Sequence, residues 1–240
     1  MPDEKPPGSA FAENYLAQRR DLRSSFGYGL GRRTRALLDA TAGALASHAG
    51  PIDVADFGCA EGAMLQALAQ AYGPRFRSGI GLDVFRSGRP PDDPAQRIRY
   101  LTADLFRGYP YPLADASVDV VVASAFMKHH PDTGQFLGQV ARVLRPGGVA
   151  VLLDPRPAVV KAGMRVGRFN PDYNPSLWSG RSIERLLAGG PLAGQLRVET
   201  FQRYWLAPNH AIHRTGVETL LPRWLIGLLG LHQCLVLRRT

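Results

Sequence analysis

The chain has 240 residues, of which 45% are hydrophobic and 20% are charged, an ordinary globular composition that excludes wholesale disorder. Its two cysteines are too few for a disulfide framework, and no metal site is expected because their neighbours lack metal-ligand spacing. The net charge of +9 makes a nucleic acid, a membrane surface or an anionic substrate a candidate binding partner.

The N-terminus and the apolar runs bear on where the protein works. The first residues, MPDEKPPGSA, are polar and rich in proline, so they do not read as a secretion signal. No uninterrupted apolar run reaches the roughly 18 residues of a membrane-spanning helix. We therefore expect a cytoplasmic protein without stable membrane insertion.

The positive charge is unevenly distributed along the chain. Residues 50–155 contain ten basic and eleven acidic side chains, which gives a net charge of −1. Residues 156–196 and 197–240 each contain six basic and two acidic side chains, a net charge of +4 each. The excess of positive charge therefore lies mostly in the last third of the chain.

Two helices are predicted before the regular part of the chain. An amphipathic pattern predicts a short helix over residues 11–23. An alanine- and leucine-rich stretch predicts a second helix over 32–48, which ends at Gly50 and Pro51. We interpret residues 1–49 as a tail and a helical cap.

From residue 50 to residue 155 the pattern alternates between strand and helix. Strands are predicted over 52–57, 79–83, 98–102, 117–123 and 149–153, and helices over 61–72 and 133–144. Three prolines within 86–97 predict a loop or a stunted helix there. This alternation is typical of a parallel, doubly wound α/β sheet.

After residue 155 the alternation breaks. Three prolines and scattered arginines over 156–178 predict a long loop or a small lid after the fifth strand. Further along, the pattern predicts a helix over 182–188, strands over 196–205 and 233–238, and an apolar helix over 211–231 broken at Pro222. The complete sheet is therefore predicted to have seven strands and to be mostly parallel.

The sharpest motif is the turn DFGCAEG at residues 56–62, which leaves the first strand and enters a helix. Glycine allows a tight turn and a close ligand approach because it has no Cβ. The helix that follows offers free N–H groups to an anionic group. The motif lacks the G-x-G-x-x-G spacing of dinucleotide sites. Within it, Cys59 is predicted to be a packing residue rather than a nucleophile.

Polar residues follow the next strands at regular positions. Asp83 ends the second strand, 25 residues after Gly58, where a carboxylate can accept hydrogen bonds from both hydroxyls of a ribose. Asp104 follows the third strand, in a position suited to an adenine amino group. The fourth strand ends at Ser124 and Ala125. This order predicts a nucleotide-like ligand at the carboxyl ends of the strands.

Together these stretches resemble the class I S-adenosylmethionine-dependent methyltransferases, in particular the small-molecule branch that includes ubiquinone and menaquinone biosynthesis enzymes. The resemblance is carried by VADFGCAEG (54–62), GLDV (81–84), TADLF (102–106), VDVVVASAFMKHHPD (118–132) and VLRPGGVAVLLDP (143–155). It implies a Rossmann-like fold, S-adenosylmethionine as cofactor and S-adenosylhomocysteine as product. It also implies that residues 50–155 bind the cofactor and that 156–240 form the substrate side of the same domain.

The resemblance assigns roles to individual residues. The turn would line the methionine end of the cofactor, Asp83 would bind the ribose, Asp104 and Leu105 the adenine, and Ser124 and Ala125 would lie beneath the sulfonium. The proline-rich stretch 84–97 departs from the family's usual helix, on the ribose and adenine side. The residues implied to bind the cofactor are Asp56, Gly58, Cys59, Ala60, Gly62, Asp83, Val84, Asp104, Leu105, Ser124 and Ala125.

His129 is the candidate catalytic residue. It follows the fourth strand, at a position where the family frequently has a histidine, and an imidazole there can act as a general base near neutral pH. The alternative is that His129 only packs against the cofactor loop, because methyl transfer from a sulfonium depends mainly on in-line placement. Both interpretations stay open.

The predicted function is methylation of a small-molecule acceptor, with oxygen favoured as the methylated atom. Aromatic residues of the N-terminal segment and of 156–178 are predicted to close over the cofactor and to suit an aromatic acceptor, while arginines in 156–178 suit an anionic one. These aromatic residues are Phe11, Tyr15, Tyr28, Tyr173 and Trp178.

Several alternatives remain open. A nucleic-acid methyltransferase would explain the net charge, although the three lysines do not fall where a ribose-methylating tetrad requires them. A protein that keeps the cofactor fold without methylating is another possibility. A minor variant has residues 220–231 touching lipid. The oligomeric state is open.

Overall fold

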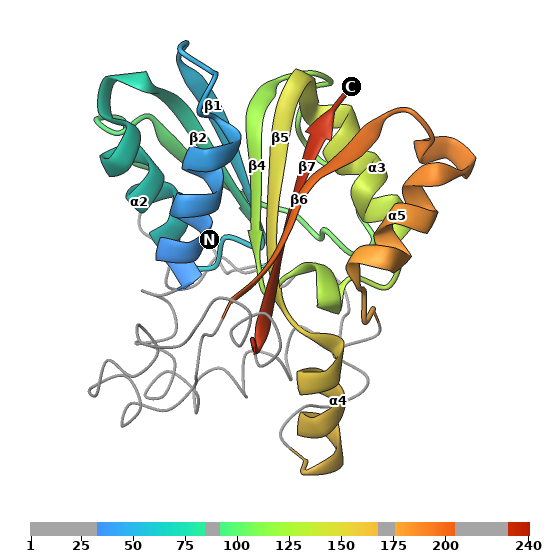
Figure 1. The fold of residues 1–240 in the computed structure, drawn as a ribbon. Helices are drawn as coiled ribbons and strands as arrows, with labels where there is room; N and C mark the ends of the chain where they lie inside the picture. The colour runs from blue at the N-terminus through green and yellow to red at the C-terminus, as the bar shows by residue number, and fades with distance from the viewer. Residues whose placement is uncertain (1–32, 85–91, 168–175, 205–229) are drawn as a thin grey trace.

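The computed structural model describes residues 33–84, 92–167, 176–204 and 230–240 of the chain (Figure 1). Within these residues the strands form one seven-stranded sheet in the order β3-β2-β1-β4-β5-β7-β6. The strands are β1 (Ile52–Phe57), β2 (Phe76–Asp83), β3 (Ile98–Thr102), β4 (Val118–Ser124), β5 (Leu144–Pro155), β6 (Leu196–Tyr204) and β7 (His232–Arg239).

The sheet is mostly parallel, as the sequence predicts. Strands β3, β2, β1, β4 and β5 run parallel to one another, whereas β7 is antiparallel to both β5 and β6. The carboxyl ends of the five parallel strands therefore share one edge, which is the lower edge in Figure 1 and is called the carboxyl edge below. Because β7 is antiparallel, its first residue, His232, lies at this edge beside Pro155 of β5.

Helices cover both faces of the sheet (Figure 1). A helix over residues 33–44 and α2 (Ala63–Tyr72) lie on one face, and α3 (Thr133–Val143) and α5 (Gly180–Ala188) lie on the other. The short 3₁₀ helices of the described residues are η1 (Gly73–Arg75), η2 (Met127–His129) and η4 (Gly190–Leu192). No helix among the described residues has the length and apolar character needed to cross a bilayer.

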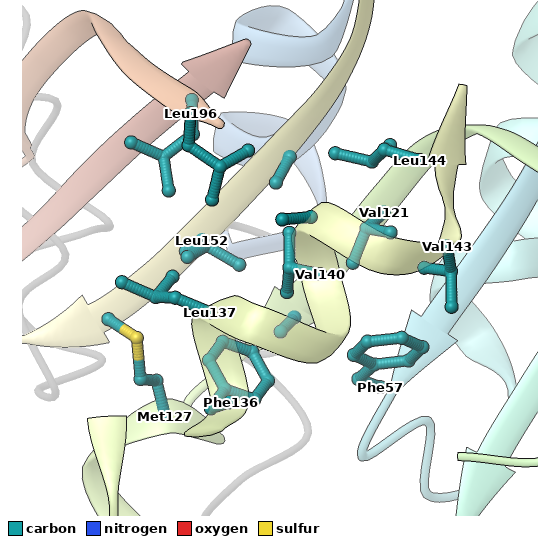
Figure 2. Packing of buried hydrophobic residues seen from close by; sticks show 14 of the residues in the cluster. Phe57, Val121, Met127, Phe136, Leu137, Val140, Val143, Leu144, Leu152 and Leu196 are labelled. Carbon is teal, nitrogen blue, oxygen red and sulfur yellow. The ribbon is translucent and has the colours of Figure 1, made fainter. Parts of the chain in front are cut away.

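Two hydrophobic clusters, one on each face, explain the nearly continuous apolar strands. On the α3 face, the fully buried residues of the helix and of three strands point toward one another (Figure 2). They include Phe136, Leu137 and Val140 of α3 and Phe57, Val121 and Leu152 of the strands. On the other face, Leu37 of the 33–44 helix and Leu65 and Leu68 of α2 cover alternate strand residues. A strand that is buried on both faces needs apolar residues throughout.

One predicted loop is a helix in the structure. Residues Pro157–Arg165 form α4, with Pro157 in the first turn and Val160 buried. The prolines of 156–178 indicate a break in the chain, but proline is tolerated in a first helical turn because its missing N–H needs no partner there. Of the two interpretations of 156–178, the long loop is therefore wrong over Pro157–Arg165, and the small lid stays a prediction.

Other predictions differ in their boundaries or lie outside the described residues. Strand β5 begins at Leu144 rather than at Val149, because Leu144 pairs with Val118 before an irregularity in the register. Residues 92–97 contain a bridge between Asp93 and Ile98 and no helix, as predicted. The helix predicted over 11–23 lies outside the described residues, as does that over 211–231 except for its last two residues.

A network of charged side chains ties together the opposite edge of the sheet. Arg77 Nε donates to Asp53 Oδ1 at 2.9 Å, and Ser78 Oγ donates to the same oxygen at 2.7 Å. Arg145 bridges Asp53 at 2.8 Å and Asp119 at 2.7 Å. Hydrogen bonds from Arg77, Ser78 and Arg145 lower the pKa of Asp53 to about 2, against a smaller opposing effect of burial.

Asp53→Asn is expected to lower the free energy of unfolding by about 2 kcal/mol at pH 7. Because the pKa of Asp53 falls from 3.8 to about 2 on folding, its contribution is present above pH 3.8 and is lost as the pH falls toward 2. Urea unfolding at pH 7 and pH 3 measures this, and the loss should be smaller at pH 3. Asp39→Asn, in an exposed pair with Arg35, is the control. Equal losses at both pH values would contradict the prediction.

Candidate active site

The predicted glycine turn links β1 to α2 at the carboxyl edge. Gly58, Ala60 and Gly62 have positive φ angles of 74°, 47° and 77°, so every second residue of the turn is left-handed. The backbone N–H groups of Gly58 and Cys59 donate to the carbonyl oxygen of Leu82 at 2.8 and 3.1 Å. The turn is thus fixed to the end of β2, and the N-terminus of α2 lies at this edge.

Both glycines of the turn are required by the protein's own packing. A Cβ at Gly58 would lie 2.3 Å from the ring of Phe126, and a Cβ at Gly62 would lie 2.1 Å from the hydroxyl oxygen of Tyr100. A side chain at Gly58 would therefore collide with the protein itself, because Phe126 already occupies that space.

Gly58→Ala is expected to lower the free energy of unfolding by about 2–4 kcal/mol, from left-handed strain and from overpacking against Phe126. Urea unfolding of Gly58→Ala, Phe126→Ala and the double variant separates the two causes. The loss in the double variant should be smaller than the sum of the single losses, because the overpacking is gone. Additive losses would show that Phe126 is not the group that Gly58 accommodates.

Two buried acidic residues lie beside the turn. Asp83, the last residue of β2, accepts a hydrogen bond from the backbone N–H of Ala60 at 2.8 Å. Asp56 lies one residue before the end of β1, and its burial, together with the charge of Asp83, raises its pKa to about 8. Asp56 is therefore mostly protonated at neutral pH while no positive charge is near. A cationic ligand fits here, because its positive charge would favour the ionised form of both carboxyl groups.

The predicted adenine residues form a tight turn after β3. Asp104 Oδ1 accepts a hydrogen bond from the backbone N–H of Phe106 at 2.9 Å, and the carbonyl oxygen of Asp104 accepts one from Gly108 at 2.7 Å. Leu105 is buried, and its carbonyl oxygen lies 2.8 Å from the hydroxyl of Tyr111, which donates to it. The backbone of this turn is therefore held by its own hydrogen bonds.

His130 connects the adenine turn to the segment after β4. Its Nδ1 accepts the backbone N–H of Asp132 at 3.1 Å, so Nε2 carries the proton and points at the carbonyl oxygen of Leu105, 2.9 Å away. Five aromatic rings surround the imidazole, and burial lowers its pKa. The rings are those of Phe106, Tyr109, Tyr111, Phe126 and Phe136. His130 is therefore a neutral packing residue.

The end of β4 makes a second left-handed turn. Ala125 has a φ of 54°, and its N–H donates to the carbonyl oxygen of Leu153 on β5 at 2.6 Å. The ammonium group of Lys128 donates to the carbonyl oxygen of Ala125 at 3.0 Å. A non-glycine residue in this conformation costs of order 1–3 kcal/mol and persists only where its surroundings hold it. The buried lysine is one of the groups that hold the turn.

Lys128 also contacts the candidate catalytic residue. Its Nζ lies within hydrogen-bond distance of His129 Nε2. An ammonium group can only donate, so Nε2 accepts and the neutral imidazole carries its proton on Nδ1. Both ring nitrogens of His129 are then unable to take a further proton while Lys128 stays charged. This geometry favours a packing role for His129 over the role of general base.

Asp154, near the end of β5, is a buried carboxylate that the sequence interpretation did not single out. Its Oδ2 accepts hydrogen bonds from the backbone N–H of Lys128 at 3.1 Å and from Trp178 Nε1 at 2.8 Å. Burial raises the pKa of Asp154 to about 6, although the charge of Lys128 opposes this effect. Trp178 is 3% exposed and packs in the hydrophobic cluster, and the lid predicted for this segment stays a prediction.

Residues 30–189 of the chain match the family model described as a methyltransferase domain. The chain belongs to this methyltransferase family. A probable S-adenosylmethionine-dependent methyltransferase of Mycolicibacterium smegmatis is 35% identical over 144 residues, 58% of this chain and 51% of that protein. The 27-O-demethylrifamycin SV methyltransferase of Amycolatopsis mediterranei is 36% identical over 138 residues, 54% of this chain and 49% of that protein.

The fold agrees with solved methyltransferases. The plantazolicin methyltransferase, solved with a triazolic desmethylPZN analog and SAH, is similar with a TM-score of 0.64 and 14% identity, covering 96% of this chain and 95% of the other. The predicted class I, S-adenosylmethionine-dependent family is confirmed, with S-adenosylmethionine as its cofactor. The quinone-biosynthesis branch stays a prediction. The chain spans about half the length of the curated relatives that it matches.

The methyltransferase brings its predicted site residues to one edge of the sheet. The turn, Asp83 with Val84, Asp104 with Leu105, and Ser124 with Ala125 all lie at or just beyond the ends of β1, β2, β3 and β4. The sequence interpretation missed Asp154, a buried carboxylate near the end of β5. A signal was present for Asp154, the only charged residue in the apolar run from 149 to 155.

Proposed function

We propose that this methyltransferase transfers a methyl group from S-adenosylmethionine to an oxygen atom of a small-molecule acceptor. The observation that carries the proposal is the family match over residues 30–189, whose motif residues converge at the carboxyl edge. The printed name of the Amycolatopsis relative, a 27-O-demethylrifamycin SV methyltransferase, supports oxygen and a natural-product acceptor. Residues 50–155 would bind the cofactor, and residues 156–240 would contribute the acceptor side.

The described residues suit this cofactor. When bound, S-adenosylmethionine supplies a methyl group on a positively charged sulfur. Asp56 and Asp83 place two carboxyl groups beside the glycine turn, where a cation and ribose hydroxyls would satisfy them. Asp104 and Leu105 would contact the adenine. The left-handed turn at Ala125 would support the sulfonium from below.

The chain's contribution to the reaction is placement. With the cofactor bound, the acceptor oxygen would have to lie in line with the methyl carbon and the sulfur, so the orientation of the two reactants would supply much of the rate. Lys128 fixes the Ala125 turn, and Asp154 fixes the backbone of Lys128. His129 is not expected to take the proton of an acceptor hydroxyl, because its Nε2 accepts a hydrogen bond from the ammonium group of Lys128.

Calorimetry and product analysis test the proposed function. The full chain should bind S-adenosylmethionine and S-adenosylhomocysteine, and a methyl group labelled with ¹³C should appear on an acceptor drawn from cell extracts. The ¹³C chemical shift distinguishes methyl groups on oxygen, nitrogen and carbon. Binding of neither ligand would overturn the proposal. Label on RNA, with binding that weakens steeply with salt, would favour the nucleic-acid alternative.

His129→Ala is expected to lower turnover by less than about tenfold, because the imidazole packs and does not accept the proton. Steady-state kinetics with the labelled acceptor, from pH 5 to pH 9, provide the measurement. The variant should show the same pH profile as the wild type. A general base would instead give a loss of roughly 10²–10⁴-fold and would remove an ionisation from the profile.

A further inference from the structure

Asp154 is a buried carboxylate whose hydrogen bonds involve only one of its two oxygens. The residue is 1% exposed. Its Oδ2 accepts the backbone N–H of Lys128 and the indole N–H of Trp178, whereas Oδ1 is buried and has no hydrogen-bond partner within the described part of the chain. A buried carboxylate oxygen without a partner costs free energy. A purely structural role would therefore explain Oδ2 and leave Oδ1 without a purpose.

The carboxyl group of Asp154 is held in one orientation. Trp178, which donates to Oδ2, is anchored a second time, because Gln233 Nε2 donates to its backbone carbonyl oxygen at 2.7 Å. Gln233 lies on β7 and pairs with Asp154 in the sheet. The carboxyl group cannot rotate without breaking the hydrogen bonds at Oδ2, so the direction of Oδ1 is fixed as well.

Asp154 lies beside the turn that is predicted to support the sulfonium. The preceding residue, Leu153, pairs with Ser124, and its carbonyl oxygen accepts the N–H of Ala125 at 2.6 Å. Neighbouring strands are about 4.8 Å apart, so the backbone of Asp154 lies roughly one strand spacing from this turn. The predicted carboxylates of the cofactor site end β1 and β2, on the other side of β4. Asp154 is therefore next to the expected methyl group and separate from those carboxylates.

The electrostatic surroundings of Asp154 suit the uptake of a proton. Burial raises its pKa to about 6, against the opposing charges of Lys128 on η2 and of Arg33 on the 33–44 helix. His232, at the start of β7, adds no charge, because burial lowers its pKa to about 3. Asp154 is thus mostly ionised at neutral pH, and its pKa lies close enough to neutrality for general base catalysis.

We propose that Asp154 is the general base of this methyltransferase, with Oδ1 accepting the hydrogen bond and then the proton of the acceptor hydroxyl. The inference rests on the proposed function and fills the role for which the contact with Lys128 disfavours His129. The proton passes from the hydroxyl oxygen to Oδ1, and the electron pair of the broken O–H bond stays on the acceptor oxygen. Asp154 then returns the proton to solvent before the next turnover.

Titration of the carboxyl group tests the inference without turnover. The full chain, labelled with ¹³C at the aspartate carboxyl groups and saturated with S-adenosylhomocysteine, is followed by NMR from pH 4 to pH 9. The probes are p-cresol and its methyl ether 4-methylanisole, which has no O–H to donate. p-Cresol should bind saturably and lower the pKa of Asp154, because a hydrogen bond to Oδ1 favours the ionised form. 4-Methylanisole should leave this pKa unchanged and bind at least about fivefold more weakly.

Two variants separate proton transfer from structure. Asp154→Asn keeps an oxygen for the hydrogen bonds at Oδ2 but cannot take up a proton. With the acceptor identified by the ¹³C label, it should lower kcat by roughly 10²–10⁴-fold, change KM by less than about threefold and remove the fall in kcat toward acidic pH. Trp178→Phe is the matched control. It removes a hydrogen bond that lowers the pKa of Asp154, so the fall in kcat should persist and move to higher pH.

The outcomes separate this inference from the proposed function. Failure to bind S-adenosylhomocysteine would overturn the function itself. Binding of S-adenosylhomocysteine with a pKa of Asp154 that p-cresol leaves unchanged, or a kcat of Asp154→Asn within about tenfold of the wild type, would overturn only the role of Asp154. The titration of the unaltered chain decides the question even where Asp154→Asn does not fold, because Trp178→Phe then identifies the carboxyl signal by displacing it.

Discussion

Asp83→Ala is expected to weaken binding of both S-adenosylmethionine and S-adenosylhomocysteine by roughly 30- to 1000-fold, or about 2–4 kcal/mol. The carboxylate is predicted to accept hydrogen bonds from the ribose hydroxyls, which both ligands carry. In the structure it also accepts the N–H of Ala60, so its removal frees one anchor of a left-handed turn. The loss of the ribose hydrogen bonds and the loss of the bond to Ala60 both weaken ligand binding.

Calorimetry with the two ligands measures this loss. Asp39→Ala, on the exposed side of the 33–44 helix, is the control and should leave both affinities unchanged. The melting temperature without ligand separates the effects, because a loss confined to the turn lowers affinity more than stability. Unaltered affinity in Asp83→Ala would remove Asp83 from the cofactor site.

Much of the sheet was predictable because burial leaves a direct trace in the sequence. The run from Val118 to Ala123 is apolar or β-branched at nearly every position, as a strand covered on both faces requires. The error at α4 has the opposite origin. Pro157 indicates a break in any local pattern, and only its place in the first turn makes it compatible with the helix that follows.

The predicted cofactor residues lie together because the carboxyl ends of parallel strands meet at one edge. The contacts that join these residues could not be predicted from the sequence. Phe126 fills the space above Gly58, and Trp178 binds Asp154 across 24 residues of chain. These contacts depend on strand register and side-chain direction, which local spacing does not specify. For the same reason the position of His232 at the carboxyl edge could not be predicted, because it follows from the antiparallel direction of β7.

Lys128→Met is expected to lower the free energy of unfolding by about 3–5 kcal/mol at pH 8, because it leaves Asp154 buried without its neighbouring cation. The pKa of Asp154 is already raised to about 6 by burial, and removing Lys128 raises it further. A raised pKa means that the ionised carboxylate destabilises the folded state. The deficit should therefore be smallest at pH 5, where Asp154 takes up a proton and only the loss of the hydrogen bond to Ala125 remains, and should grow as the pH rises through and beyond 6.

Urea unfolding from pH 5 to pH 8 tests this expectation. Lys161→Met, at an exposed position of α4, is the matched control and should change stability little at any pH. Adding Asp154→Asn to Lys128→Met should remove the pH dependence, because no buried carboxylate remains to titrate. A deficit in Lys128→Met that stays constant with pH would show that the lysine acts through the Ala125 turn alone, since the hydrogen bond to that carbonyl oxygen does not depend on Asp154.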